Sequence, residues 1–189
     1  MKPVRWTVTN GFGAVSVTPQ GGPLGSAHIA RPTIADRAQQ EFTVDVPEGV
    51  SRLEAGISNP SDPSADLDLY VFSGGELVAS QADGDSDEAV SIENPAAGTY
   101  TVLVNAYSVP SGQTEFDYRD VFYSDDLGSL DVSTGTLELA GGESASVEGA
   151  ITAKVGPTEG RRLFGRMRLV SSEGAVVGTG TVIVKGVMK

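Results

Sequence analysis

The sequence predicts an all-β protein built from two β-sandwich modules. Short stretches alternate between apolar and polar residues with a period of two, which is the pattern of strands that bury one face. The 24 glycines and 10 prolines among 189 residues supply turns between many short strands. No run of ten or more residues has the apolar spacing of an amphipathic helix.

Residues 66–72 carry the clearest strand pattern. One side of the extended chain carries Leu67, Leu69 and Val71, and the other carries Asp66, Asp68, Tyr70 and Phe72. Because Asp66 and Asp68 point the same way, their carboxylates must be solvated, hydrogen-bonded or bound to a cation. Residues 98–104 alternate in the same manner and are the expected pairing partner.

The N-terminal segment predicts two further strands. Residues 4–9 and 14–18 alternate on either side of the turn-forming Asn10-Gly11, so we expect them to form a strand pair. Residues 20–26 are rich in glycine and are expected to form a loop or linker. Trp6, the only tryptophan, is expected in a core; the alternative is a platform on which a ligand stacks.

The remaining strands follow in order along the chain. Before the tail, strands are expected at residues 41–46, 52–57, 77–80, 90–92 and 115–118. Residues 59–64 contain two prolines and form a loop, and residues 73–76 form the turn of a hairpin. In the tail, alternation predicts five strands, around Leu130, Leu137, Val147, Leu163 and Val182.

The charge is distributed unevenly, which indicates separate modules. The net charge is −12, yet residues 1–126 contain 19 acidic and 6 basic side chains, whereas residues 127–189 contain 6 and 7. We therefore expect an N-terminal strand pair at 1–27, one sandwich at 28–126 and another at 127–189. The acidity argues against nucleic-acid binding, which requires a basic surface.

Features of composition bear on the cellular location. The chain has no cysteine, so outside the cell its fold must depend on its core or on metal ions rather than on disulfides. No apolar run approaches the ~20 residues of a membrane span. No hydrophobic segment follows Met1-Lys2-Pro3, so these residues are not a signal peptide, and Met1 is interpreted as the start of an excised fragment.

Three segments, in this order, resemble the bacterial pre-peptidase C-terminal domain. They are Phe42-Thr43-Val44-Asp45-Val46-Pro47-Glu48-Gly49, Asp66-Leu67-Asp68-Leu69-Tyr70-Val71-Phe72 and Pro95-Ala96-Ala97-Gly98-Thr99-Tyr100-Thr101-Val102. The resemblance covers about residues 30–123. It implies a jelly-roll-like β-sandwich appended to secreted proteases.

The tail resembles the fibronectin-III-like domain that follows many subtilisin-like proteases, through residues 135–147 and 164–169. Together the two resemblances imply a non-catalytic C-terminal region of an extracellular subtilisin-like serine endopeptidase, which aids stability, folding or substrate binding. The protease domain is then a partner in the same parent chain. Such a sandwich needs about seven strands, so we expect residues 4–18 to pair with strands of 127–187 and the first sandwich to be inserted in the second.

The residues themselves argue that this chain is not an enzyme. Serine-protease chemistry needs Ser, His and an acid in one constellation. The sole histidine, His28, is expected in a loop near Ser26 and is interpreted as a surface residue. There is no Gly-x-Ser-x-Gly motif, no cysteine nucleophile and no glycine-rich phosphate loop before a helix. The alternative, an enzyme in its own right, needs a deep pocket around His28.

Calcium is the one cofactor that the residues favour. Ca²⁺ binds six to eight oxygens, several of them carboxylates. The candidate ligands, from two acidic stretches that can meet at one sandwich edge, are Asp66, Asp68, Asp83, Asp85 and Asp87. The last three have the spacing of the start of an EF-hand loop, but Glu88 stands where that motif needs glycine. The alternative is a solvated acidic loop.

Two groups of side chains are candidates for a binding surface. Tyr107, Tyr118 and Tyr123 suit a wet surface that holds a polymeric protein or polysaccharide. A basic group in the tail is either an outer strand face or a docking surface for the acidic module or the protease domain; it consists of Arg161, Arg162, Arg166 and Arg168. A flat strip of exposed tyrosines would favour a stand-alone carbohydrate- or protein-binding adhesin instead.

Overall fold

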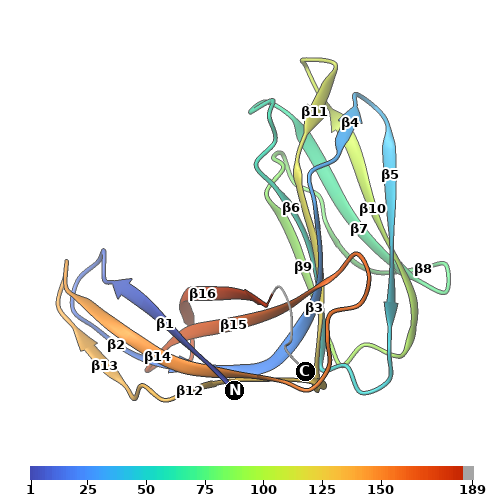
Figure 1. Cartoon of the computed structure of the whole chain (residues 1–189). Coiled ribbons are helices and arrows are strands. Elements are labelled where there is room, and N and C mark those ends of the chain that lie inside the picture. The colour runs from blue at the N-terminus through green and yellow to red at the C-terminus, as the bar shows by residue number, and fades with distance from the viewer. Residues whose placement is uncertain (185–189) are drawn as a thin grey trace. The chain divides into compact units, whose positions relative to one another are not determined.

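The computed structural model describes residues 1–184 and is built of strands throughout. These residues contain no helix, which confirms the all-β class. A helix that could cross a membrane is accordingly absent from residues 1–184. The chain divides into two compact units (Figure 1). Unit 1 combines Met1–Ser26 with the tail from Ser124 onward, and unit 2 is Ala27–Tyr123.

Unit 2 consists of two sheets and a short ribbon. One sheet has the strand order β5 (Gln39–Val46), β10 (Gly98–Ser108), β7 (Asp66–Ser73) and β8 (Glu76–Gln81). In the other layer, β6 (Arg52–Ser58) pairs with β9 (Glu88–Glu93) and with the first half of β12 (Asp117–Val132). The ribbon pairs β4 (Thr33–Ala35) with β11 (Gln113–Glu115).

Alternation along these strands buries one face of each sheet. Leu67, Leu69 and Val71 of β7 are fully buried, and the alternate residues of β6 from Leu53 to Ile57 are almost so. The predicted pairing of residues 66–72 with 98–104 is confirmed, because β7 and β10 are antiparallel neighbours. The predicted hairpin turn at residues 73–76 joins β7 to β8.

Up to residue 184, unit 1 has eight strands, several of them far apart in the sequence. Their order is β1 (Lys2–Thr9), β14 (Ser144–Ala153), the second half of β12, β3 (Gly22–Ala30), β15 (Arg162–Ser171), β2 (Val15–Gln20) and β13 (Leu137–Leu139), with β16 (Val176–Val184) also against β15. The core contains Leu24, Leu130, Val147, Ile151, Leu163 and Met167, and Trp6 packs against it. The expected five tail strands are all present.

Two expectations for the N-terminal segment are wrong. β1 and β2 do not pair with each other, since β1 pairs with β14 while β2 pairs with β13 and β15. The reason lies at Asn10, whose backbone and side chain bond to the segment 139–143 rather than closing a hairpin. The expected loop at 20–26 is mostly strand β3, in which Leu24 is fully buried.

The course of the chain explains the division into units. β3 leads from unit 1 into unit 2, and the long strand β12 leads back. Strands from residues 2–20 pair with strands from residues 137–171, and the whole of unit 2 lies between these segments in the sequence. That the tail belongs to a fibronectin-III-like domain stays a prediction.

Candidate cation-binding site

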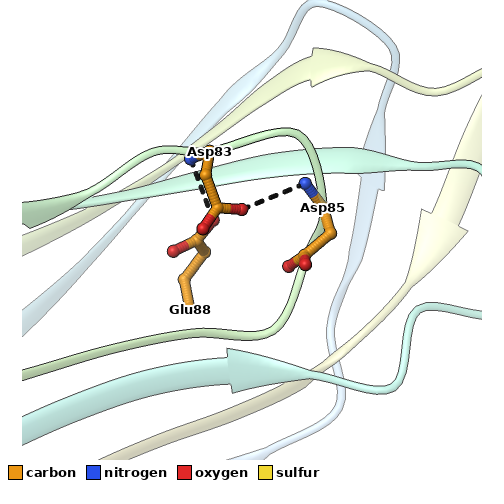
Figure 2. A group of neighbouring side chains, drawn as sticks. All are labelled: Asp83, Asp85 and Glu88. Carbon is orange, nitrogen blue, oxygen red and sulfur yellow. Dashed lines mark hydrogen bonds between the residues drawn. The ribbon is translucent and has the colours of Figure 1, made fainter.

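An acidic cluster lies in unit 2, where the loop after β8 meets β9. One carboxylate oxygen from each of Asp83, Asp85 and Glu88 lies within 4.8 Å of the others (Figure 2). The structure thus brings together two of the predicted ligands, Asp83 and Asp85, and adds Glu88. Neither Asp68 nor Asp87 belongs to this group of described residues.

Glu88 is the buried member of the cluster. Its side chain is 1% exposed, its Oε1 accepts a hydrogen bond from the backbone N–H of Asp83 at 3.3 Å, and its Oε2 has no hydrogen-bond partner. Burial, followed by repulsion from the Asp83 and Asp85 carboxylates, raises the pKa of Glu88, although the Asp83 N–H opposes this. Glu88 is therefore a buried acid that lacks a compensating charge.

The position of Glu88 follows from strand alternation. Glu88, Val90 and Ile92 lie on one side of β9, and the residues between them are exposed. An acidic side chain therefore occupies the first inward position of the strand. This alternation is the signal in the sequence that identifies Glu88 as an inward-facing acid. The EF-hand comparison does not select Glu88, because that motif requires glycine at this position.

Asp66, at the start of β7, belongs to the same acidic neighbourhood. Its Oδ1 is buried without a hydrogen-bond partner. Burial raises the pKa of Asp66 most, and the charges of Asp68, Asp83 and Asp85 raise it further. The strand and the loop thus each contribute carboxylates to one region.

Backbone and serine hydrogen bonds hold the acidic loop in place. The Oδ1 of Asp83 accepts the N–H of Asp85 at 3.3 Å, and the Oδ1 of Asp85 accepts the N–H of Asp87 at 2.8 Å. Buried Ser86 donates its hydroxyl to the carbonyl of Ala65 at 2.7 Å and accepts the N–H of Leu67 at 3.1 Å. The loop is therefore fixed against the beginning of β7.

The other two predicted ligands bond elsewhere in the protein. Asp68 is buried, and its Oδ2 accepts hydrogen bonds from Asn105 at 2.9 Å and from the Tyr70 hydroxyl at 3.3 Å. The Oδ1 of Asp87 accepts the backbone N–H of Asn59 at 3.4 Å. These carboxylates have structural roles beside the cluster.

Asn59 connects the acidic loop to a second polar network. Its positive φ of 50° is a conformation that asparagine tolerates, and its Nδ2 donates to Asp117 at 2.9 Å. Arg31 donates to the other oxygen of Asp117 at 2.6 Å. A hollow of about 360 Å³ lies beside Asn59, lined by residues of the loops 59–65 and 84–87, so one side of the acidic loop faces open space.

The predicted tyrosine surface is only partly present. Tyr107 is 56% exposed, and the Arg37 guanidinium lies 5.2 Å from the centre of its ring. Tyr118 and Tyr123 are 1% and 2% exposed, so their assignment to a binding surface is wrong. The two side chains lie on opposite faces of β12. Tyr118 pairs with Ile57 of β6 and stacks its ring on Phe42 at 3.6 Å, whereas the Tyr123 ring lies under the Arg52 guanidinium at 4.8 Å and its hydroxyl donates to Glu54 at 3.4 Å.

His28 lies in strand β3 rather than in the expected loop. Its Nδ1 is 3.5 Å from an oxygen of buried Asp120, and its ring meets the Tyr118 ring edge-on at 5.7 Å. The expectation that His28 is a surface residue in a loop is therefore wrong. His28 is half-buried, and its imidazole ring packs among aromatic rings.

The four arginines of the tail are not equivalent. Arg161 donates from Nε to the Ser26 hydroxyl at 2.8 Å and from Nη2 to the Ser26 carbonyl at 2.7 Å. Arg162, Arg166 and Arg168 alternate along β15 on the side opposite buried Leu163 and Met167. Phe164 lies on the same side as these three arginines, yet it is buried, and the Arg166 guanidinium is 5.9 Å from the centre of its ring. A basic docking surface therefore stays a prediction, while Arg161 fastens the start of β15 to β3.

Comparison with known proteins finds a family model that matches part of the chain. Residues 41–106 match the family described as the bacterial pre-peptidase C-terminal domain. Pyrolysin from Pyrococcus furiosus is 31% identical over 155 residues, which cover 79% of this chain and 11% of pyrolysin. The chain therefore spans about a tenth of that relative.

Two solved structures resemble the chain, both with low TM-scores. A periplasmic inhibitor of g-type lysozyme from Aeromonas hydrophila is 16% identical with a TM-score of 0.39, covering 51% of this chain and 85% of the inhibitor. The lipase BlEst2 of Bacillus licheniformis in its propeptide form is 13% identical with a TM-score of 0.38, covering 83% of this chain and 40% of the lipase.

Proposed function

We propose that this chain, which contains a bacterial pre-peptidase C-terminal domain in unit 2, is a non-catalytic accessory region of an extracellular subtilisin-like serine protease. Its partner is the protease domain of the same parent chain. Its task is to stabilise the folded enzyme.

The similarity to pyrolysin, a subtilisin-like protease, is the observation that carries this proposal. The family match lies wholly within unit 2, but the 155 matched residues exceed the span of residues 27–123. The similarity therefore continues into unit 1. Pyrolysin thus matches residues of both units within one chain. This supports the proposal that both units belong to one region of a protease, since unit 1 is formed by the segments on either side of unit 2.

The environment of the single histidine supports an accessory role. His28 packs edge-on against Tyr118 and Phe42, and Asp120 lies beside its Nδ1. A general base needs a ring that can reach a reacting hydroxyl. The aromatic packing of His28 favours a fixed structural ring, and catalysis is assigned to the parent's other domain.

The burial of two of the three candidate tyrosines favours stabilisation over substrate binding. A polymer-binding strip needs several flat aromatic rings at the surface, whereas two of the three candidates are buried in β12. Arg162 and Arg168, on one side of β15, are positive side chains near which an acidic protein domain can dock.

The full-length gene and a deletion variant of its product test the proposal. The parent protein should encode a subtilisin-like protease domain, and deletion should remove both units together because unit 1 lacks two strands without residues 1–20. We expect the deletion variant to lose activity faster on heating while turnover of a small peptide substrate at low temperature stays the same.

Two other results would replace the proposal. A parent gene without a protease domain would leave the adhesin as the better assignment. A deletion variant with unchanged thermal inactivation but weaker binding to an insoluble protein or polysaccharide would assign substrate holding instead of stabilisation.

A further inference from the structure

We propose that Asp66, Asp83, Asp85 and Glu88 form a Ca²⁺ site that fastens the loop between β8 and β9 to the start of β7. This inference concerns unit 2 alone. It does not depend on whether the parent protein is a protease.

The unpartnered oxygens of the cluster are the first argument. Oε2 of Glu88 is buried in a side chain that is 1% exposed, and it belongs to the residue whose carboxylate converges with those of Asp83 and Asp85. Oδ1 of Asp66 is also buried without a partner. A buried carboxylate oxygen that accepts no hydrogen bond is unfavourable unless something else compensates it, and a bound cation supplies that compensation.

The second argument is the absence of a basic partner. Among residues 1–184, no lysine, arginine or histidine forms an ion pair with any of the four carboxylates. The basic side chains of unit 2 that form ion pairs do so with other acids; Arg31, for example, pairs with Asp117. Four acidic side chains in one region therefore have no cationic side chain beside them, which favours a bound metal ion as their counter-charge.

The spacing of the oxygens favours calcium over magnesium. Oxygens bound to one Ca²⁺ at 2.3–2.6 Å can be up to about 5 Å apart, whereas those bound to Mg²⁺ at 2.0–2.1 Å can be at most about 4 Å apart. The oxygens of Asp83, Asp85 and Glu88 lie within 4.8 Å of one another, a limit that one Ca²⁺ spans without movement of the loop. The donor set consists of carboxylates, without the nitrogen or sulfur ligands typical of zinc.

The loop is already held in the geometry that the ion requires. Asp83 and Asp85 each accept a backbone N–H through Oδ1, which leaves the second oxygen of each carboxylate for a metal. Ser86 and the carbonyl of Asp85 both bond to Leu67, next to Asp66. Binding therefore orders few additional groups, and the ion connects the same two segments that these bonds connect.

Thermal unfolding and calorimetric titration of the complete chain test the site. The protein is dialysed against EDTA and then measured in chelator, in CaCl₂ and in MgCl₂. At a calcium concentration 100 times Kd, the ratio of folded to unfolded protein should rise about 100-fold, which corresponds to an increase in Tm of about 5–10 °C for a chain of this size. MgCl₂ should give a clearly smaller increase.

Matched variants separate a specific site from general charge effects. Asp83→Asn and Glu88→Gln should remove the calcium-dependent rise in Tm and the heat of binding. Asp87→Asn removes the same charge from the same loop but from a side chain that bonds to Asn59, so it should respond to calcium like the wild type. The Tm in chelator checks that each variant is folded. Asp83→Asn and Glu88→Gln should not lower it, because each removes a repulsive charge from the metal-free cluster.

Several results would overturn the assignment. Equal Tm values in chelator and CaCl₂ together with no heat of binding would return the four acids to a solvated loop. Equal responses to CaCl₂ and MgCl₂, or equal loss of response in Asp83→Asn and Asp87→Asn, would mean that cations act by screening charge rather than by occupying this site.

Discussion

The indole N–H of Trp6 in β1 donates to the backbone carbonyl of Thr181 in β16 at 3.3 Å, although 175 positions separate the two residues. The contact is possible because Gly180 has no side chain. A Cβ at position 180 would lie 2.8 Å from two atoms of the indole ring and 2.9 Å from the end of Met167. Trp6 is thus a packing residue of unit 1, as expected for a core tryptophan.

Substitution of Gly180 should disturb this contact. We expect Gly180→Ala to destabilise the protein by about 1–3 kcal/mol, because the indole and Met167 must move to accommodate the methyl group. Fluorescence reports the change directly, since Trp6 is the only tryptophan. Gly178→Ala is the control: its Cβ would meet only the flexible end of Leu169, at 3.2 Å, and its emission spectrum should match that of the wild type.

Asn10 should be among the most sensitive polar residues of unit 1. Its Nδ2 donates to the carbonyls of Gly13, Leu139 and Ala140, and its Oδ1 accepts the N–H of Phe12. Asn10→Ala leaves these groups without partners and should cost about 2–4 kcal/mol in urea unfolding. Thr9→Ala, which removes one exposed hydroxyl contact to Ser144, should cost under about 1 kcal/mol; equal losses would contradict this role of Asn10.

Asp117 should contribute to stability at neutral pH and lose that contribution in acid. Hydrogen bonds from Asn59 and then Arg31 hold the pKa of Asp117 below its usual value of 3.8. The unfolded state therefore binds a proton first, and stability falls as the pH drops from about 5 through the folded-state pKa. Asp117→Asn should be less stable than the wild type at pH 7, and the difference should shrink by pH 3.

Urea midpoints at both pH values check this expectation. Asp126→Asn makes the same change at an exposed side chain. Its difference from the wild type should change much less between pH 7 and pH 3. A difference for Asp117→Asn that stays constant with pH would mean that the hydrogen bonds, and not the charge, stabilise this network.

Asp68 should have a structural role and should not bind calcium. Asp68→Ala leaves the Asn105 amide and the Tyr70 hydroxyl without their acceptor and should cost about 1–3 kcal/mol. Asp68→Asn keeps an acceptor oxygen and should cost less. Both variants should keep the full calcium-dependent rise in Tm, and loss of that rise in Asp68→Asn would add Asp68 to the ligand set.

The strands β5, β6, β7 and β10 could be predicted because one face of each is buried. The alternation of residues 66–72 gave both the strand and its inward face, and the glycines at 74 and 75 gave the hairpin. β3 could not be predicted in the same way. Gly22, Pro23 and Gly25 are typical of loops, and only the burial of Leu24 and Ala27 against distant segments makes this stretch a strand.

The candidate site was predictable in its ligand type but not in its membership. The spacing of Asp83 and Asp85, which matches the start of an EF-hand loop, predicts that this loop can bind a cation. Glu88 was not recognised because a sequence motif describes one loop at a time, whereas burial of Glu88 depends on which side of β9 faces the interior. The same limit applies to Tyr118 and Tyr123, since their burial depends on the partners of β12.

The insertion of unit 2 between the two parts of unit 1 has a consequence for synthesis on the ribosome. β1 and β2 emerge from the exit tunnel first, but β13 to β15, with which they pair, follow only after all of residues 27–123. At about 5–20 residues per second, this interval lasts roughly 5–20 s. The nascent chain can therefore complete unit 2 while its first two strands are still unpaired, and unit 1 closes last.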